Sequence, residues 1–177
     1  QAPIKATEGA NERYQPAHSR VDRVSTVEEI AARLEAAGAV HWRGRGELIT
    51  LPWKPPMTGP ILLIDLWSGF SGASIAMLSL GVKIYVLAAE SNPDVAKMAE
   101  ASLDQIVHVP MVELIDARMI EGIMKKRSIQ AIVVGGCSPC HGNTSLNKGR
   151  KGLDDPRSLQ PNELVRIRDE LRRTYPK

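Results

Sequence analysis

The chain has 177 residues, of which 43% are hydrophobic, 24% charged and only 4% aromatic, and its formal net charge is +3. This composition is typical of a folded domain with an aliphatic core and excludes a disordered tail, a collagen-like fibre and a disulfide-stapled miniprotein. The two cysteines, Cys137 and Cys140, are too few for a disulfide framework or a four-thiolate zinc site. No stretch approaches the roughly 18 apolar residues of a membrane span, and no apolar signal-peptide core is present, so we expect a reduced intracellular compartment.

Positive charge gathers toward the C-terminus. Residues 148–177 contain nine basic and five acidic side chains, whereas the remainder of the chain is slightly acidic. A basic segment of this kind can contact phosphate, and it can equally be the solvated face of a helix. Charge alone therefore leaves nucleic-acid binding open.

The part before residue 61 divides into a flexible arm and a small extension. Residues 1–24 show no hydrophobic period, which predicts the arm. The extension, 25–60, opens with a capping box in which Ser25 pairs with Glu28 or Thr26 with Glu29. Its expected elements are a helix over 26–37, a short hairpin within 40–51 and a proline-rich linker over 52–60.

From residue 61 onward, apolar runs alternate with helical segments, which predicts a parallel sheet covered by helices on both faces. The expected fold class is therefore α/β, with a Rossmann-like sheet in residues 61–177. The expected strands cover 61–66, 82–89, 107–109 and 129–134, and the expected helices cover 72–80, 93–103, 117–126 and 161–173.

The sheet is expected to be incomplete. The strand over 129–134 is apolar enough to be buried on both faces, yet only one more helix follows it. Either another chain supplies the neighbouring strand, or the segment before Pro52 covers this edge, or the sequence is a fragment.

Three places at predicted strand ends carry residues suited to holding a nucleoside cofactor. The turn from Asp65 to Gly72 has glycines that let the backbone approach a ligand, and Glu90 follows the second strand, where a carboxylate can accept both ribose hydroxyls. Asp116 follows a third apolar segment. Each place also has a structural interpretation, as a tight turn, a helix N-terminal charge and a helix N-cap. Together they predict a crevice at the carboxyl ends of adjacent strands.

A fourth place is the loop from Gly135 to His141, in which Cys137 and Cys140 have the spacing C-x-x-C-H. This spacing fits a dithiol redox motif, a haem c attachment site or a single cysteine nucleophile at a strand end. Two inert thiols are the structural alternative. Glycines after the motif disfavour the helix that a dithiol motif opens, and the absence of an export signal disfavours haem attachment.

These motifs resemble those of the DNA (cytosine-5)-methyltransferases. The turn that begins at Asp65 is similar to the family's D-L-F-S-G-x-G-G cofactor motif, with Trp67 in place of Phe and Ser71 in place of the first paired glycine. Glu90 and Asp116 match the ribose-binding and adenine-binding acids of the family. The resemblance implies a cofactor, S-adenosylmethionine, and a Rossmann-like methyltransferase sheet. The residues expected to bind this cofactor are Asp65, Leu66, Trp67, Ser68, Gly69, Phe70, Gly72, Glu90, Ser91, Asp116 and Ala117.

The resemblance also implies a catalytic residue and a substrate. Pro139 and Cys140 match the P-C nucleophile motif, and residues 150–159 resemble the stretch that follows it in the family. The implied reaction begins when the Cys140 thiolate adds to C6 of a flipped cytosine in DNA, which makes C5 nucleophilic enough to take the methyl group. C5 then loses its proton and the thiolate is eliminated, while Pro139 shapes the loop. The implied DNA contacts are Ser138, His141, Lys148, Arg150, Lys151 and Arg157.

The sequence also departs from the family. His141 stands where the family has Gln, and neither an E-N-V nor a Q-x-R-x-R motif occurs. Because the glutamate of E-N-V assists the attack on the ring, one part of a split or truncated enzyme is expected. A second chain would then supply the remaining strands, both motifs and the target-recognition region. The alternative is a noncatalytic module that binds S-adenosylmethionine or a protein partner. The expected location is the nucleus in a eukaryote and the cytoplasm in a prokaryote or virus, with no membrane contact.

Overall fold

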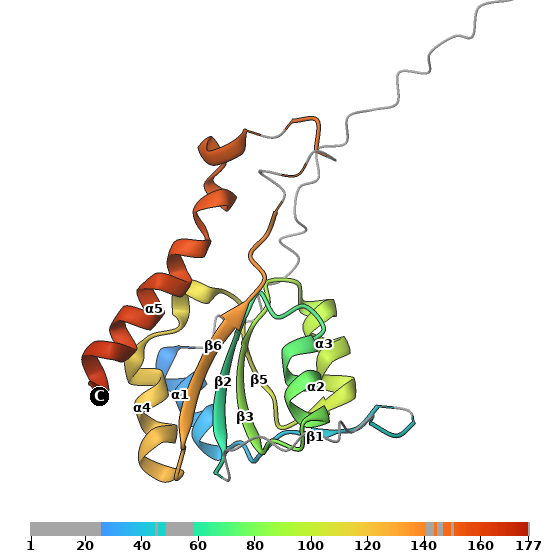
Figure 1. Ribbon diagram of the computed structural model, residues 1–177, viewed down its shortest axis with the longest axis vertical. Helices are drawn as coiled ribbons and strands as arrows, with labels where there is room; N and C mark the ends of the chain where they lie inside the picture. The colour runs from blue at the N-terminus through green and yellow to red at the C-terminus, as the bar shows by residue number, and fades with distance from the viewer. Residues whose placement is uncertain are drawn as a thin grey trace, which may run out of the picture.

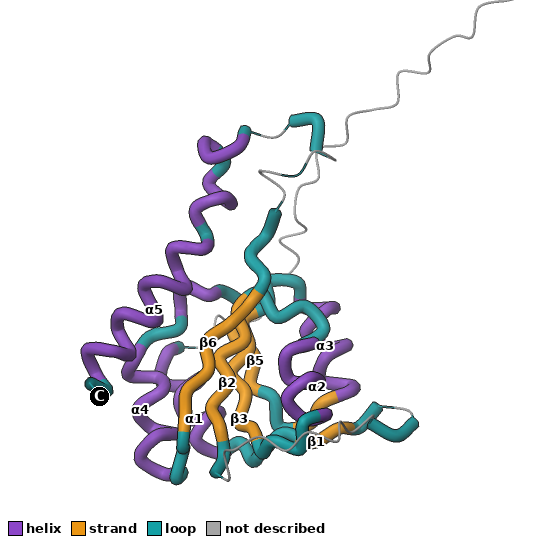
Figure 2. Tube along the Cα trace, viewed as in Figure 1, coloured by secondary structure: helices purple, strands orange, loops and turns teal. Residues whose placement is uncertain are grey.

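The structure is a computed structural model that describes residues 26–44, 46–48, 59–140, 144, 147–149 and 151–176. The predicted arm over 1–24 and most of the predicted linker lie outside these residues. Figures 1 and 2 show a central sheet with helices on both faces. The predicted α/β class is therefore confirmed, and the architecture is compatible with a Rossmann-like fold.

The central sheet has four parallel strands in the order β5-β3-β2-β6. Every residue of β2 and β3 is buried, whereas the residues of β6 are half-buried or exposed. The two inner strands have a bonded neighbour on each side and helices above and below, which explains their continuous apolar sequence. The bounds are β2 Ile61–Leu66, β3 Ile84–Ala89, β5 Val107–Val109 and β6 Ala131–Gly136.

Alternate side chains along the strands divide the core into two clusters, one on each face of the sheet. Leu62 and Ile64 of β2 belong to the cluster under α1, α4 and α5. Ile61 and Leu63 belong to the cluster on the opposite face, where α2 and α3 lie (Figure 1). The helices are α1 Val27–Ala36, α2 Gly72–Ser79, α3 Pro93–Ser102, α4 Ala117–Lys126 and α5 Pro161–Thr174, and the short 3-10 turns are η1 Val112–Leu114, η2 Gly152–Asp154 and η3 Pro156–Leu159.

The predicted helix over 26–37 is confirmed as α1, and Thr26 with Glu29 forms its capping box. The buried side chains of Ile30 and Leu34 anchor this helix in the same core cluster as α4. The predicted bounds of β2, β5 and α4 match the structure. β3 and β6 each begin two residues later than predicted, and β6 runs two residues beyond its predicted end, to Gly136.

The prediction of a hairpin within 40–51 is wrong for the part that the structure describes. The strand β1, His41–Trp42, pairs antiparallel with β4, Leu103–Asp104, from a distant part of the chain. The Asp104 carboxylate accepts from the His41 N–H at 2.8 Å, so a side chain reinforces this pairing. Since β1 joins β4 in a separate two-stranded sheet, it does not cover the edge of β6.

None of the helices in the described ranges has the length and apolar character that crossing a membrane requires.

Candidate functional site

The chain reverses its direction of winding between β2 and β6. From β2 it proceeds outward through β3 to β5, and it then returns to place β6 on the other side of β2. The helix after β2 and the helix after β6 consequently lie on opposite faces of the sheet (Figure 1). In open parallel sheets the carboxyl ends of strands at such a switch point leave a crevice that binds ligands. The predicted turn and the predicted cysteine loop both begin at this point.

The turn between β2 and α2 has an unusual backbone. Trp67, Gly69 and Ser71 all have left-handed conformations, with φ values of 52°, 54° and 56°. A positive φ is uncommon for residues with a side chain, and residues in such strained conformations cluster at active sites and ligand-binding segments. At Gly69 no atom lies within 4 Å of the place where a Cβ would be, so the backbone faces open space. The turn therefore leaves room for a ligand close to its main chain.

Asp65 places a buried carboxyl group next to this turn. Its side chain is only 3% exposed, and its Oδ2 has no hydrogen-bond partner among the described residues. Burial without a partner disfavours the charged form and raises the pKa of Asp65 to about 7. A cationic or hydrogen-bond-donating ligand would supply what this carboxyl group lacks.

Glu90 connects the loops that follow β2 and β3. Its Oε2 accepts from the Gly69 N–H at 3.0 Å, and its Oε1 accepts from the Asn92 N–H at 2.7 Å. The carboxylate therefore fixes the left-handed turn beside the end of β3. Each carboxylate oxygen retains a second lone pair, so Glu90 can still accept from a ligand hydroxyl.

The structure adds His108 to the candidate site, and this residue was not predicted from the sequence. His108 on β5 lies in register with Ala88, which in turn lies in register with Asp65, so the three share one face of the sheet. The His108 Nδ1 and the Glu100 carboxylate are 3.0 Å apart, and the imidazole Nε2 has no partner in the described part of the chain. Burial lowers the pKa of His108, and Glu100 opposes that shift. The sequence did contain a signal for His108, because it is a polar residue at the centre of the apolar triplet 107–109.

Two roles were predicted for Asp116, cofactor binding and helix capping, and the structure shows the capping role. It is the N-cap of α4, and its Oδ1 accepts from the Met119 N–H at 2.9 Å. The adjoining Ala117 is the first residue of that helix. Both lie after β5 on the carboxyl side of the sheet, so the capping bond and a place beside the crevice are compatible.

The other predicted cofactor residues differ in exposure. Leu66 is fully buried in the core, so only its backbone can face a ligand. Trp67 is half-buried against the same core, and its indole N–H has no partner within the described ranges. Phe70 projects from the turn with 57% of its surface exposed. Ser68 is half-buried, and Gly72 and Ser91 are exposed.

The cysteine loop begins where β6 runs close against β2. Gly135 lies in register with Asp65, and a Cβ on Gly136 would collide with the backbone oxygen of Leu66. Glycine is therefore required at Gly136, because any side chain would push β6 away from β2. Cys137 follows directly, and both Cys137 and Cys140 are exposed free thiols.

The comparisons with known proteins assign no family. No family model matches this chain, and no curated protein matches it.

The predicted DNA contacts are only partly described. Ser138 is half-buried in the cysteine loop, as is the predicted catalytic residue Pro139, whereas Lys148 and Lys151 are exposed. His141 and Arg150 lie outside the described residues, as does the side chain of Arg157 on η3. Among the residues that the structure describes, no group of three His, Cys, Asp or Glu side chains could hold a metal ion.

Proposed function

We propose that the chain is the cofactor-binding and nucleophile-bearing part of a DNA cytosine-5 methyltransferase. The observation that carries this proposal is the meeting of the turn after β2 and the cysteine loop after β6 at the switch point of the sheet. Glu90 joins the same edge through its bond to Gly69. A nucleoside at the end of β3 and a nucleophile at the end of β6 would thus face one crevice.

The residues at this edge fit S-adenosylmethionine. The ligand combines a sulfonium cation, an amino acid and an adenosine. An unpartnered oxygen on Asp65 suits a positively charged or hydrogen-bond-donating group, and the free indole N–H of Trp67 suits an acceptor. The open space at Gly69 leaves room for the ligand, and Glu90 suits the ribose hydroxyls. When bound, S-adenosylmethionine supplies the methyl group.

Cys140 is the proposed nucleophile for cytosine C6. It is exposed, and its carbonyl oxygen accepts from the Thr144 N–H at 2.9 Å. Pro139 restricts the backbone directly before Cys140, because the proline ring fixes the φ angle. The exposed side chains of Lys148 and Lys151 are suitable contacts for the DNA phosphates beside a flipped base.

Mass spectrometry of the intact chain tests the proposal. The chain is incubated with S-adenosylmethionine and a DNA duplex in which one cytosine carries fluorine at C5. Because fluorine blocks the final elimination, an active thiol stays joined to C6. We expect a covalent adduct that Cys140→Ser abolishes and that Cys137→Ser changes by less than about twofold, since only one thiol attacks. Both thiols are exposed, so the two variants are matched controls for each other.

The other outcomes separate the alternatives. An adduct that survives in Cys140→Ser would refute the assigned nucleophile. Equal loss in both variants would favour a dithiol mechanism in which Cys137 and Cys140 act together. If the wild type forms no adduct but binds S-adenosylmethionine in a calorimeter, methyl transfer by this chain alone is refuted, and either one part of a split enzyme or a binding module remains. Absence of both refutes the proposal as a whole.

A further inference from the structure

The outer edge of β6 has no partner strand in the part of the chain that the structure describes. On its inner side β6 pairs with β2 along its full length, from Ala131 to Gly136. The N–H and C=O groups of the other edge are therefore available, and such an edge is a template for another extended chain.

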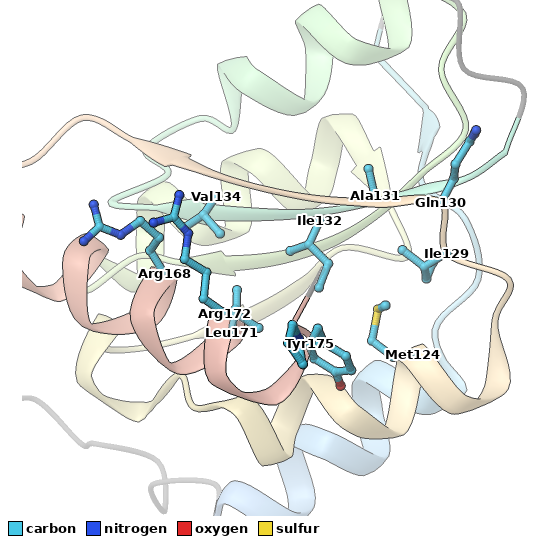
Figure 3. A pocket seen from close by; sticks show the side chains of 11 residues that line it. Met124, Ile129, Gln130, Ala131, Ile132, Val134, Arg168, Leu171, Arg172 and Tyr175 are labelled. Atoms are coloured by element: carbon cyan, nitrogen blue, oxygen red, sulfur yellow. The ribbon is translucent and has the colours of Figure 1, made fainter.

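An apolar groove runs beside this edge (Figure 3). Its volume is about 740 Å³, and it is bounded by β6, the end of α4 and one face of α5. Ile132 and Val134 of β6 line it, although equally apolar side chains on β2 and β3 are buried. Tyr175 closes one part of the groove, and its buried hydroxyl has no partner among the residues described. The apolar residues of the lining also include Met124, Ile129, Ala131, Leu171 and Pro176.

The rim of the groove is positively charged. Arg168 and Arg172 of α5 extend toward the end of the groove at which Val134 lies (Figure 3). Arg168 pairs with Asp169 at 2.8 Å, whereas Arg172 makes no ion pair within the described ranges. None of the described residues that line the groove is acidic. A partner with a carboxylate at this end would complement Arg172.

The position of α5 is fixed from the other side by Arg166. Its guanidinium donates to the backbone oxygen of Ile115 at 2.9 Å, to that of Val112 at 3.4 Å, and to the carboxylates of Glu163 and Glu170. These bonds tie α5 to the segment before α4. The wall of the groove is therefore held by contacts that do not involve the groove itself.

We propose that β6 and this groove bind an extended strand of a second polypeptide, which adds to the sheet and places an acidic residue beside Arg172. Pairing of β6 with β6 of a second copy would place no acid beside Arg172, because Ala131–Gly136 contains no acidic residue. A small apolar ligand would leave the strand edge without backbone partners. The proposal rests on the groove alone and holds whether or not the chain transfers methyl groups.

Peptide binding to the full chain tests the proposal. The probe is a fluorescein-labelled peptide with blocked ends and the sequence Lys-Thr-Ile-Val-Ile-Val-Asp-Lys, which is extended and carries one acid near its end. Binding is followed by fluorescence anisotropy, and hydrogen exchange reports which amides become protected. We expect saturable binding that slows exchange in Ala131–Gly136. A peptide with Pro in place of its second Ile is expected to lose this binding, because Pro lacks an N–H and interrupts the backbone hydrogen bonds between the two strands.

Two charge reversals on the same helix test the role of Arg172. Arg172→Glu is expected to weaken binding of the peptide about fivefold, whereas Arg173→Glu, at an exposed position outside the groove lining, should change it by less than about twofold. A peptide with Lys in place of Asp should regain affinity for Arg172→Glu.

Three results would overturn the proposal. The first is the absence of binding up to a peptide concentration of about 1 mM. The second is equal weakening by Arg172→Glu and Arg173→Glu. The third is self-association of the chain, in a sedimentation experiment, that protects the amides of β6 and excludes the peptide, because the occupant would then be a second copy.

Discussion

Replacement of Asp65 by Asn is expected to change how the stability of the chain depends on pH. The Asp65 side chain is buried with one oxygen unpartnered, and burial raises its pKa from the ordinary value of 3.8 to about 7. In the unfolded chain the group is exposed to water and titrates near its ordinary value. Between these two values the folded chain holds a proton that the unfolded chain has released.

The size of the effect follows from this difference. Each pH unit between the two values lowers the free energy of unfolding by about 1.4 kcal/mol through this group. The unfolded chain binds fewer protons in this window, so stability falls as the pH rises. Asn has the shape of the neutral carboxyl group and does not titrate. From pH 4.5 to pH 7, the wild type is therefore expected to lose about 3 kcal/mol of stability relative to Asp65→Asn.

Urea denaturation at a series of pH values measures this difference directly. Unfolding is followed by far-ultraviolet circular dichroism for the wild type, for Asp65→Asn and for Asp154→Asn, which removes an exposed carboxyl group. The titration of all other groups cancels when the variants are compared at each pH. Equal pH dependence in the wild type and in Asp65→Asn would refute the reasoning, because the carboxyl group would then be solvated in the folded chain.

Two further substitutions test how the fold holds the site and the groove. Gly136→Ala is expected to lower the free energy of unfolding by about 1–3 kcal/mol, because the new Cβ collides with the backbone oxygen of Leu66. Gly135→Ala, where no atom lies within 4 Å of the new Cβ, should change stability by less than about 0.5 kcal/mol in the same urea titration, and similar values for both would contradict the close approach. Arg166→Met is expected to cost about 1–3 kcal/mol by breaking bonds to backbone and carboxylate oxygens. The exposed Arg173→Met is its control, and an equal cost in thermal unfolding would show that Arg166 does not hold α5.

The alternation of elements from residue 61 was readable from the sequence because each strand is either fully buried or strongly apolar. The prediction of β2 as 61–66 matches the structure, since burial on both faces leaves an uninterrupted apolar run. The end of β6 was placed too early because Gly135 and Gly136 have low strand propensity. They continue the strand because their lack of a side chain permits the close approach to β2.

Long-range contacts account for what the sequence did not predict. Trp42 pairs with Leu103, and nothing in the local pattern of either segment specifies the other. His108 and Asp65 share a face of the sheet only through the register of three strands. Local signals did predict that polar residues would follow the strands, and parallel topology then brings these residues to one edge. The capping role of Asp116 was equally readable, because the residue directly precedes a helical segment.

The bonds of Arg166 also bear on the kinetics of strand addition. Because α5 is already held against the segment before α4, the side of the groove that α5 forms is in place before any partner binds. Only the incoming strand then has to become ordered, which lowers the entropic cost of association. An encounter with a preformed site is limited by orientation rather than by rearrangement of the chain. The arginines on the rim would attract an acidic strand at long range, so its association would slow as ionic strength rises.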